Sequence, residues 1–268
     1  MRKFHTYRFG LFAFFALILM SFEQDKSVFT LNKSFPFKAD KMLADHIGNY
    51  YLVSDYKVQK VNRFDSLLQF HQRKNLGKIG RVDVSNPMKI LVYFPDFRSI
   101  DILDNNMTEL RVLKLDEYGD MQVNAVCASN TNGIWIYDEN TAILKRINDQ
   151  GEIIKQSVST RQSMNKVLHV SSMLERNGYV YLCDENEGIA VFDLFGSYSK
   201  LIPIKGIQSF NVIQDQLIFM QNKTLVNYNL QSLSAKEMQL PNPNAKDVCL
   251  FNNKLVSLDG DSVSVYQF

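Results

Sequence analysis

The chain has 268 residues, of which 46% are hydrophobic and 22% are charged, and its formal net charge is +2. Residues 1–24 contain three cations and one anion, so the rest of the chain is formally neutral. A neutral segment has no overall field to attract the phosphates of a nucleic acid. The roughly 245 residues that remain suffice for one closed all-β domain. We therefore expect a single domain and no nucleic-acid partner.

The first 24 residues have the pattern of a secretory signal peptide. Positively charged residues precede an uncharged run at 9–20, and polar residues follow it. The run is shorter than the about 20 apolar residues that span a membrane. We predict that residues 1–24 are a signal peptide and that the protein is exported. Because Leu19 and Ser21 make a poor cleavage pair, an uncleaved N-terminal anchor is the alternative.

Residues 27–35 form the first predicted strand. Phe29, Leu31 and Phe35 are separated by even numbers of residues, so in a regular strand their side chains lie on one face. Alternating apolar side chains are typical of a strand with one buried face. This strand precedes the repeats described next and belongs to none of them.

The rest of the chain repeats one pattern of strands and turns. Residues 134–137 are β-branched and aromatic, and the Asp-Glu-Asn sequence at 138–140 is typical of a turn. Equivalent positions in six such copies are separated by 39, 44, 45, 38 and 38 residues. This period is typical of the four-stranded blades of a β-propeller. The second strands of the blades are predicted at residues 49–55, 89–94, 134–137, 177–184, 216–220 and 254–259.

Each copy lies between two further apolar segments, so three of the four strands are recognisable in every blade. The preceding segment is predicted to line the central channel as an inner strand. The predicted inner strands are residues 42–46, 82–85, 123–128, 168–172, 210–213 and 248–251. The predicted third strands are residues 57–61, 99–103, 142–147, 189–192, 225–228 and 263–266.

The sixth predicted blade lacks an outer strand of its own. If residues 27–35 pair beside residues 262–268, the ring closes and no sheet edge is left open there. The predicted fold is therefore all-β. We expect a single six-bladed β-propeller of four-stranded antiparallel blades over residues 25–268, closed by an N-terminal strand that completes the last blade.

The turns within these repeats carry a family resemblance. Residues 135–151 and 180–193 share one order of features: a hydrophobic strand, a turn that contains Asp, and a second hydrophobic strand. Asp or Asn follows the second strand, and in the first segment a Gly comes after it. This order resembles the six-bladed propellers related to the NHL-repeat class, and residues 51–55 and 61–65 fit it as well. The chain also resembles the exported six-bladed propellers of Bacteroidota envelopes. That resemblance implies a protein of the periplasm or one associated with the outer membrane.

Blades two, five and six depart from the family pattern. Phe-Pro-Asp at 94–96 and Gln-Asn-Lys at 221–223 replace the Asp turn. These departures weaken a strict NHL assignment but leave the propeller prediction intact. The resemblance concerns the fold and carries little information about function.

A metal site in the channel is one function that the resemblance suggests. Some six-bladed relatives are hydrolases or lactonases that hold a divalent cation at the channel mouth with Glu, Asp and Asn. The predicted inner strands contain no Glu, and polar side chains facing channel water are the simpler interpretation. The candidates for such a metal site are Asp45, His46, Asp83, Asn124, His169, Asn211 and Asp247.

Catalytic motifs are missing from the sequence. Asp138 and Asp184 each precede a Glu, as paired carboxylates in acid–base catalysis can do. However, an Asp at a turn usually accepts bonds from backbone amides, so we predict that these two residues and Asp55 cap turns. Residues 25–268 contain no H-E-x-x-H, G-x-S-x-G or phosphate-binding glycine motif. We predict no catalytic residue and no cofactor.

Cysteines and aromatic residues are assigned to the core. Cys127, Cys183 and Cys249 fall in different blades, so we expect small buried hydrophobes rather than a disulfide or a zinc site. Wide aromatic side chains suit the flat surfaces between blades. The aromatic residues predicted there are Tyr50, Tyr51, Trp135, Tyr179, Tyr181 and Phe219.

A cationic stretch at residues 71–81 is the candidate partner-binding surface. Arg73, Lys74, Lys78 and Arg81 occur there without an acid. Such a stretch suits an acidic partner or anionic membrane lipid nearby, while a solvated connection between blades is the simpler interpretation.

The sequence as a whole predicts a non-enzymatic protein-binding or scaffold propeller of the bacterial cell envelope, with an envelope protein as partner. One alternative is a divalent-metal-dependent hydrolase or lactonase that uses the channel residues. Another is a sensor of a carbohydrate or other ligand, which would require exposed aromatic side chains at a channel mouth.

Overall fold

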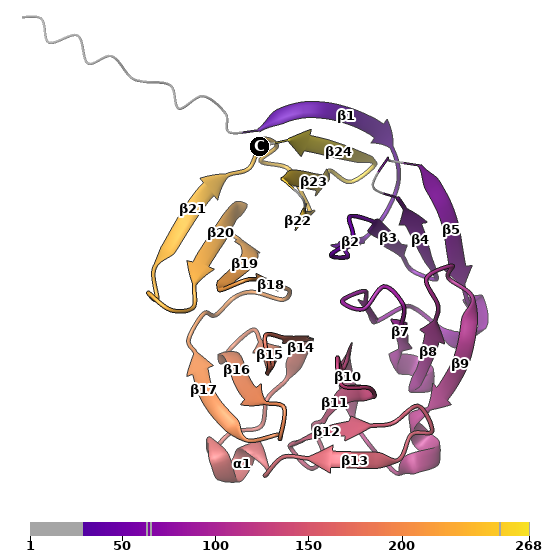
Figure 1. The fold of residues 1–268 in the computed structure, drawn as a ribbon, viewed down its shortest axis with the longest axis vertical. Coiled ribbons are helices and arrows are strands. Elements are labelled where there is room, and N and C mark those ends of the chain that lie inside the picture. The colour runs from indigo at the N-terminus through magenta and orange to yellow at the C-terminus, as the bar shows by residue number, and fades with distance from the viewer. Residues whose placement is uncertain (1–28, 63, 65, 252, 268) are drawn as a thin grey trace, which may run out of the picture.

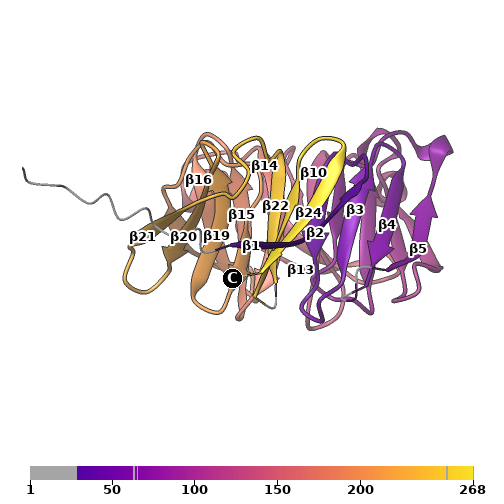
Figure 2. The same ribbon diagram turned by 90° about the horizontal axis from the view of Figure 1, so that it is seen from above.

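The computed structural model describes residues 29–62, 64, 66–251 and 253–267, so the predicted signal peptide at 1–24 lies outside the described residues. Six antiparallel sheets of four strands each make up the described fold. The sheets are arranged as blades around a central axis (Figure 1), and the ring is flattened along that axis (Figure 2). The predicted six-bladed β-propeller is confirmed.

The innermost strand of each blade lines the channel (Figure 1). The first two inner strands end two residues earlier than predicted, and the fourth runs from 170 to 176 rather than from 168 to 172. The first strand stops at Ala44 because the Asp45 carboxylate accepts the backbone N–H groups of Ile47 and Asn49 and so begins a turn. The inner strands are β2 (Lys41–Ala44), β6 (Arg81–Asp83), β10 (Val123–Ala128), β14 (Val170–Arg176), β18 (Asn211–Ile213) and β22 (Asp247–Phe251).

The second strands form most of the buried core. They are almost continuously apolar because neighbouring blades cover both of their faces, and β7 and β11 are buried at every position. All six lie where the repeat predicted them. The second strands are β3 (Tyr50–Ser54), β7 (Ile90–Phe94), β11 (Ile134–Asp138), β15 (Tyr179–Asp184), β19 (Gln216–Gln221) and β23 (Lys254–Leu258).

The third and fourth strands complete each blade outward. The third strands match their predicted positions to within one residue at either end. They are β4 (Lys57–Val61), β8 (Ser99–Leu103), β12 (Ile143–Ile147), β16 (Gly188–Asp193), β20 (Thr224–Asn229) and β24 (Ser262–Gln267). The outer strands are β5 (Leu67–Gln72), β9 (Glu109–Lys114), β13 (Ile153–Gln156), β17 (Tyr198–Ile202), β21 (Ala235–Gln239) and β1 (Thr30–Pro36).

The N-terminal strand β1 closes the ring, as predicted. It pairs antiparallel with β24, from Thr30 opposite Gln267 to Pro36 opposite Ser262. A bulge between Leu31 and Lys33 shifts the register, so the predicted alternation fails at one position. Phe29 is buried and Phe35 packs against the core, whereas Leu31 is exposed.

Side-chain turns fix the connections between the third and outer strands. In each of the first five blades, an Asn or Asp oxygen at the start of this turn accepts the backbone N–H of the residue two positions later. This bond mimics a backbone turn and needs a short polar side chain. It is the physical basis of the recurring Asp or Asn in the sequence. The residues concerned are Asn62, Asp104, Asn148, Asp193 and Asn229.

Helical segments are confined to short turns between strands. None of the helices within the described ranges is long and apolar enough to cross a membrane. They are η1 (Lys74–Leu76), η2 (Pro95–Phe97), η3 (Leu115–Tyr118) and α1 (Thr160–Ser163).

Five of the six aromatic residues assigned to the core are buried. Trp135, Tyr50 and Tyr51 are inaccessible to solvent, and Tyr181 and Phe219 are nearly so. Tyr179 was assigned wrongly, because it is the first residue of β15 and is 42% exposed at the strand end. Its ring contacts Tyr181 edge to face instead of filling the space between blades.

Candidate functional site

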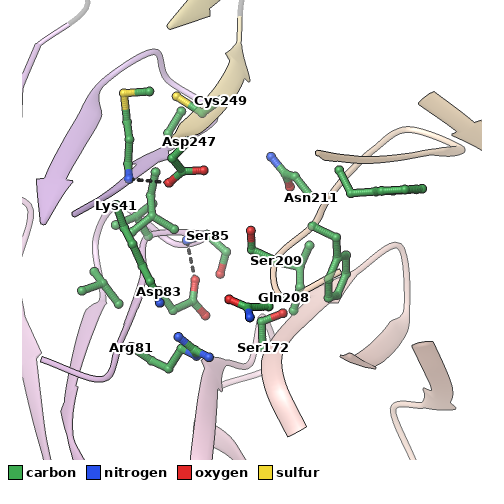
Figure 3. Close-up of a pocket in the computed structure, with 18 of the residues that line it drawn as sticks. Lys41, Arg81, Asp83, Ser85, Ser172, Gln208, Ser209, Asn211, Asp247 and Cys249 are labelled. Carbon is green, nitrogen blue, oxygen red and sulfur yellow. Dashed lines mark hydrogen bonds between the residues drawn. The ribbon is translucent and has the colours of Figure 1, made fainter. Parts of the chain in front are cut away.

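A cavity of about 180 Å³ lies in the central channel. Figure 3 shows the side chains that surround it. Lys41, Arg81 and Asp83 lie on one side of the cavity, and Gln208 and Ser209 face them from the other. The channel is therefore lined by charged and polar groups as well as by apolar ones.

Lys41 and Arg81 occupy equivalent positions in this channel, since each begins an inner strand. Neither forms a salt bridge with any residue that the structure describes, and an Arg81 Nη1–H group donates to the Gly80 carbonyl, 3.0 Å away. Burial, and then repulsion from Arg81, hold the pKa of the Lys41 ammonium below its usual value. Arg176 also borders the cavity, from the end of β14. The sequence prediction placed Arg81 in the cationic stretch at 71–81 and named neither Lys41 nor Arg176 as a channel residue.

Asp83 and Asp247 tie neighbouring blades together. One Asp83 oxygen accepts the backbone N–H of Ser85 at 2.7 Å, and the other accepts that of Ala128, in the next blade, at 2.6 Å. Asp247 likewise accepts from Val248 at 2.9 Å and from Met42, across the seam between the last and first blades, at 2.8 Å. Their oxygens are thus already used for structural bonds.

Burial opposes the charged form of both carboxylates. It raises the pKa of Asp83, an effect that the backbone hydrogen bonds and Arg176 oppose. It also raises the pKa of Asp247 to about 6, against the opposing effects of the hydrogen bonds and Lys41. Asp247 therefore titrates near neutral pH inside the folded ring.

A pH experiment follows from Asp247. A pKa raised from about 4 to about 6 favours the protonated folded state, so this carboxyl stabilises the fold most below pH 4. We expect up to about 3 kcal/mol of that stability to disappear as the pH rises through 6. Asp247→Asn should lack this loss, which denaturant unfolding between pH 4 and 7 would measure. If the stability of the wild type and of Asp247→Asn changed with pH in the same way, this prediction would be wrong. Asp261→Asn, which removes a carboxylate from an exposed residue, is the control.

Of the remaining metal-site candidates, only Asn211 borders the cavity; Asp45, His46, Asn124 and His169 do not. The buried Asp45 carboxylate accepts from the Asn49 amide and the Tyr51 hydroxyl. Asn211 begins β18 and accepts its neighbour's N–H. Within the described ranges, no group of three or more His, Cys, Asp and Glu side chains lies close enough to hold one metal ion.

Asn124 and His169 meet at Glu139 instead. The Asn124 amide donates to one Glu139 oxygen at 2.7 Å, and His169 Nδ1 lies 3.1 Å from the other. Glu139 is buried, whereas the His169 side chain is mostly exposed. Together the three side chains link the third blade to the fourth.

Two of the three turn aspartates cap turns, as predicted. Asp138 accepts the backbone N–H groups of Gln122 and Asn140, and Asp184 accepts those of His169, Asn186 and Glu187. Although burial opposes the shift, bonds from Lys145 and Thr141 hold the pKa of Asp138 below its usual value. Asp55 differs from the prediction, because its carboxylate pairs with Lys78 at 3.0 Å.

The four cations of the stretch at 71–81 have separate environments. Arg73 Nε lies 3.3 Å from the buried Asp101, and Nη1 lies 3.2 Å from Glu109, on the second blade. Lys78 is paired with Asp55, and Arg81 turns into the channel. Lys74 is exposed and forms no salt bridge with a described residue. The stretch is therefore not one continuous cationic surface.

The cysteines are free thiols. Cys127 and Cys183 are buried, as predicted, and Cys249 is half-buried beside the channel. Burial raises the pKa of the Cys127 and Cys183 thiols, which keeps them in the unreactive protonated form.

Comparisons with known proteins bear on the fold. No family model matches the chain, and no curated protein matches it. Among solved structures, it is similar to a virginiamycin B lyase from Staphylococcus aureus, with a TM-score of 0.64, 13% identity, and coverage of 90% of this chain and 99% of that one.

Two further solved structures are similar over the same share of this chain. The Pan2 WD40 domain of Neurospora crassa has a TM-score of 0.64 and 9% identity, with 96% of that chain covered. BamB from Moraxella catarrhalis has a TM-score of 0.58 and 11% identity, with 98% of that chain covered. At such identities these similarities establish the propeller fold alone.

Proposed function

We propose that this chain is an exported, non-enzymatic protein-binding or scaffold propeller of the bacterial cell envelope, and that it binds its protein partner through the outer edge of the first blade. The observation that carries the proposal is an exposed apolar hairpin. Phe64, Leu67 and Phe70, on the hairpin between β4 and β5, have exposed fractions of 72%, 57% and 56%. Several large apolar side chains exposed on one hairpin are typical of interaction sites.

The geometry of β5 supports the same surface. It is the outermost strand of its sheet, and no described strand pairs with its other edge. An open edge offers backbone N–H and C=O groups to an extended segment of another protein, while alternate side chains provide specificity. The exposed Lys74 lies just beyond β5 and adds a positive charge suited to an acidic partner or to nearby anionic lipid.

Export is the other part of the proposal and rests on residues 1–24. Their pattern of cations followed by an uncharged run is that of a signal peptide. The periplasm or the surface of the outer membrane is the compartment we propose, on the resemblance to exported propellers. The chain is also similar in fold to BamB, a similarity that concerns the fold and does not itself indicate a compartment.

In-cell crosslinking tests this function. A photoreactive residue at position 70 should capture a stoichiometric envelope protein, whereas one at Leu110, exposed on the outer strand of the second blade, should not. The double change Leu67→Glu and Phe70→Glu should weaken the complex by at least about tenfold, because charge disrupts an apolar contact. Leu110→Glu is the matched control.

Two outcomes would contradict the proposal. One is equal crosslinking at positions 70 and 110, which would indicate non-specific capture. The other is a partner-free protein that carries one tightly held divalent ion and loses it in Asp83→Asn, which would favour the metal-dependent hydrolase or lactonase alternative.

A further inference from the structure

The charges that line the channel cavity do not balance. Three cations, Lys41, Arg81 and Arg176, border it, but only two carboxylates, Asp83 and Asp247, do so. Arg176 interacts favourably with Asp83, and Asp247 does so with Lys41. Arg81 is left without a carboxylate partner among the described residues, and its buried Nε–H has no hydrogen-bond acceptor. A partly buried cation of this kind is costly unless an anion accompanies it.

Backbone hydrogen bonds hold the two carboxylates in place, and neither forms a salt bridge with Arg81. Their four oxygens accept the backbone N–H groups of Ser85, Ala128, Met42 and Val248. These bonds hold the blades together, so the carboxylates cannot turn toward the guanidinium without leaving buried amides unpaired. An anion from solution would therefore supply the partner that Arg81 lacks among the described residues.

The side of the cavity opposite Arg81 is also polar. Gln208, Ser209 and Asn211 face it in Figure 3, and the Ser172 hydroxyl is buried without a hydrogen-bond partner. The Asn211 oxygen already accepts the N–H of Val212, which leaves its amide N–H groups to donate. The Gln208 amide donates to the Glu185 carboxylate at 3.3 Å, which leaves only its second N–H for a ligand. The Asn211 amide and the Ser172 hydroxyl are the other donors available on this side.

We propose that the central channel binds a small oxyanion, a carboxylate or phosphate compound, whose charged oxygens contact Arg81 and Lys41 and whose other polar atoms meet Gln208 and Ser172. The volume of about 180 Å³ equals the share of roughly six liquid water molecules. A metabolite-sized anion fits this space. The guanidinium supplies a planar pair of donors, the geometry that carboxylate and phosphate oxygens accept best. This site is independent of the apolar hairpin proposed to bind protein.

Calorimetric titration of the purified propeller tests the proposal, with citrate as the carboxylate probe and inorganic phosphate as the phosphate probe. At constant ionic strength, we expect saturable binding of at least one of them with a stoichiometry of one. Arg81→Gln should weaken that binding by about tenfold or more, because hydrogen bonds to charged groups are among the strongest. Arg111→Gln, which removes the same charge from an exposed position on β9, should change it less than twofold.

Two outcomes overturn the proposal. Absence of binding for both anions, or equal weakening in Arg81→Gln and Arg111→Gln, would show that the channel holds no specific anion. If circular dichroism shows that Arg81→Gln is unfolded, Lys41→Gln replaces it and must weaken binding to the same extent. Citrate binding without phosphate binding would identify a carboxylate ligand, and the reverse a phosphate.

Discussion

Deletion of residues 29–36 is expected to abolish the folded monomer. This change removes β1 and leaves β24 with an unpaired edge from Ser262 to Gln267. It also removes Phe29 and Phe35 from two core clusters, and the loss of one buried Phe side chain alone costs about 3–5 kcal/mol. Together with the lost strand pairing, this approaches the total stability of a typical domain, about 5–15 kcal/mol. Size-exclusion chromatography and circular dichroism should show aggregated or unfolded protein.

The matched control for the deletion is Leu31→Ser. Leu31 lies in the same strand but is exposed, so its replacement should leave the melting temperature within about 2 °C. A synthetic peptide of residues 25–38 should restore a soluble monomer when added to the deleted protein during refolding, since it supplies the missing strand. A deleted protein that remains monomeric and melts at the wild-type temperature would show that β1 does not close the ring.

Replacement of Glu175 is expected to have the second-largest effect. This residue of the fourth blade is almost fully buried, and its carboxylate accepts Trp135 Nε1–H at 2.6 Å and the Asn130 backbone N–H at 2.9 Å, both in the third blade. Glu175→Ala leaves the buried Trp135 Nε1–H and the part-buried Asn130 N–H without an acceptor and opens a cavity, so we expect a loss of about 3–5 kcal/mol. For a domain of this size that corresponds to a decrease of about 6–15 °C in melting temperature.

Trp135 itself reports the result, because it is the only tryptophan in the chain. Its fluorescence follows unfolding in denaturant at the very contact that the mutation removes. Glu237→Ala, on the exposed outer strand β21, is the control and should change stability by less than about 0.5 kcal/mol. If Glu175→Ala loses less than about 1 kcal/mol, the bond between the third and fourth blades contributes little to the ring.

The predictability of this fold has a simple origin. Each blade must bury both faces of its second strand, so an apolar run recurs with the period of a blade, and residues 134–137 are the clearest example. The turns that separate the strands need short polar side chains, as Asn148 and Asp193 illustrate. The apolar runs and the turn residues each lie within a short segment, so both can be recognised without knowing which blades are in contact.

The candidate site was predicted far less well. Asp83 was correctly placed on an inner strand and Asp247 lies one residue before the predicted start of another, but the sequence could not distinguish a metal ligand from a carboxylate that accepts an amide of the next blade. Those amides belong to Ala128 and Met42, 45 and 205 residues away in the sequence. Arg81 belonged to an apparently continuous cationic stretch, and only the position of β6 on the channel separates it from Lys74.

The number of blades, their strand order and the closure by an N-terminal strand were predictable from the amino-acid sequence, because they follow from side-chain periodicity and turn chemistry within short segments. Which polar groups meet across the seams, and which side chains enter the channel, became known only from the folded structure. Such contacts join residues that are distant along the chain, and a single bulge, as between Leu31 and Lys33, reverses the face on which a side chain lies.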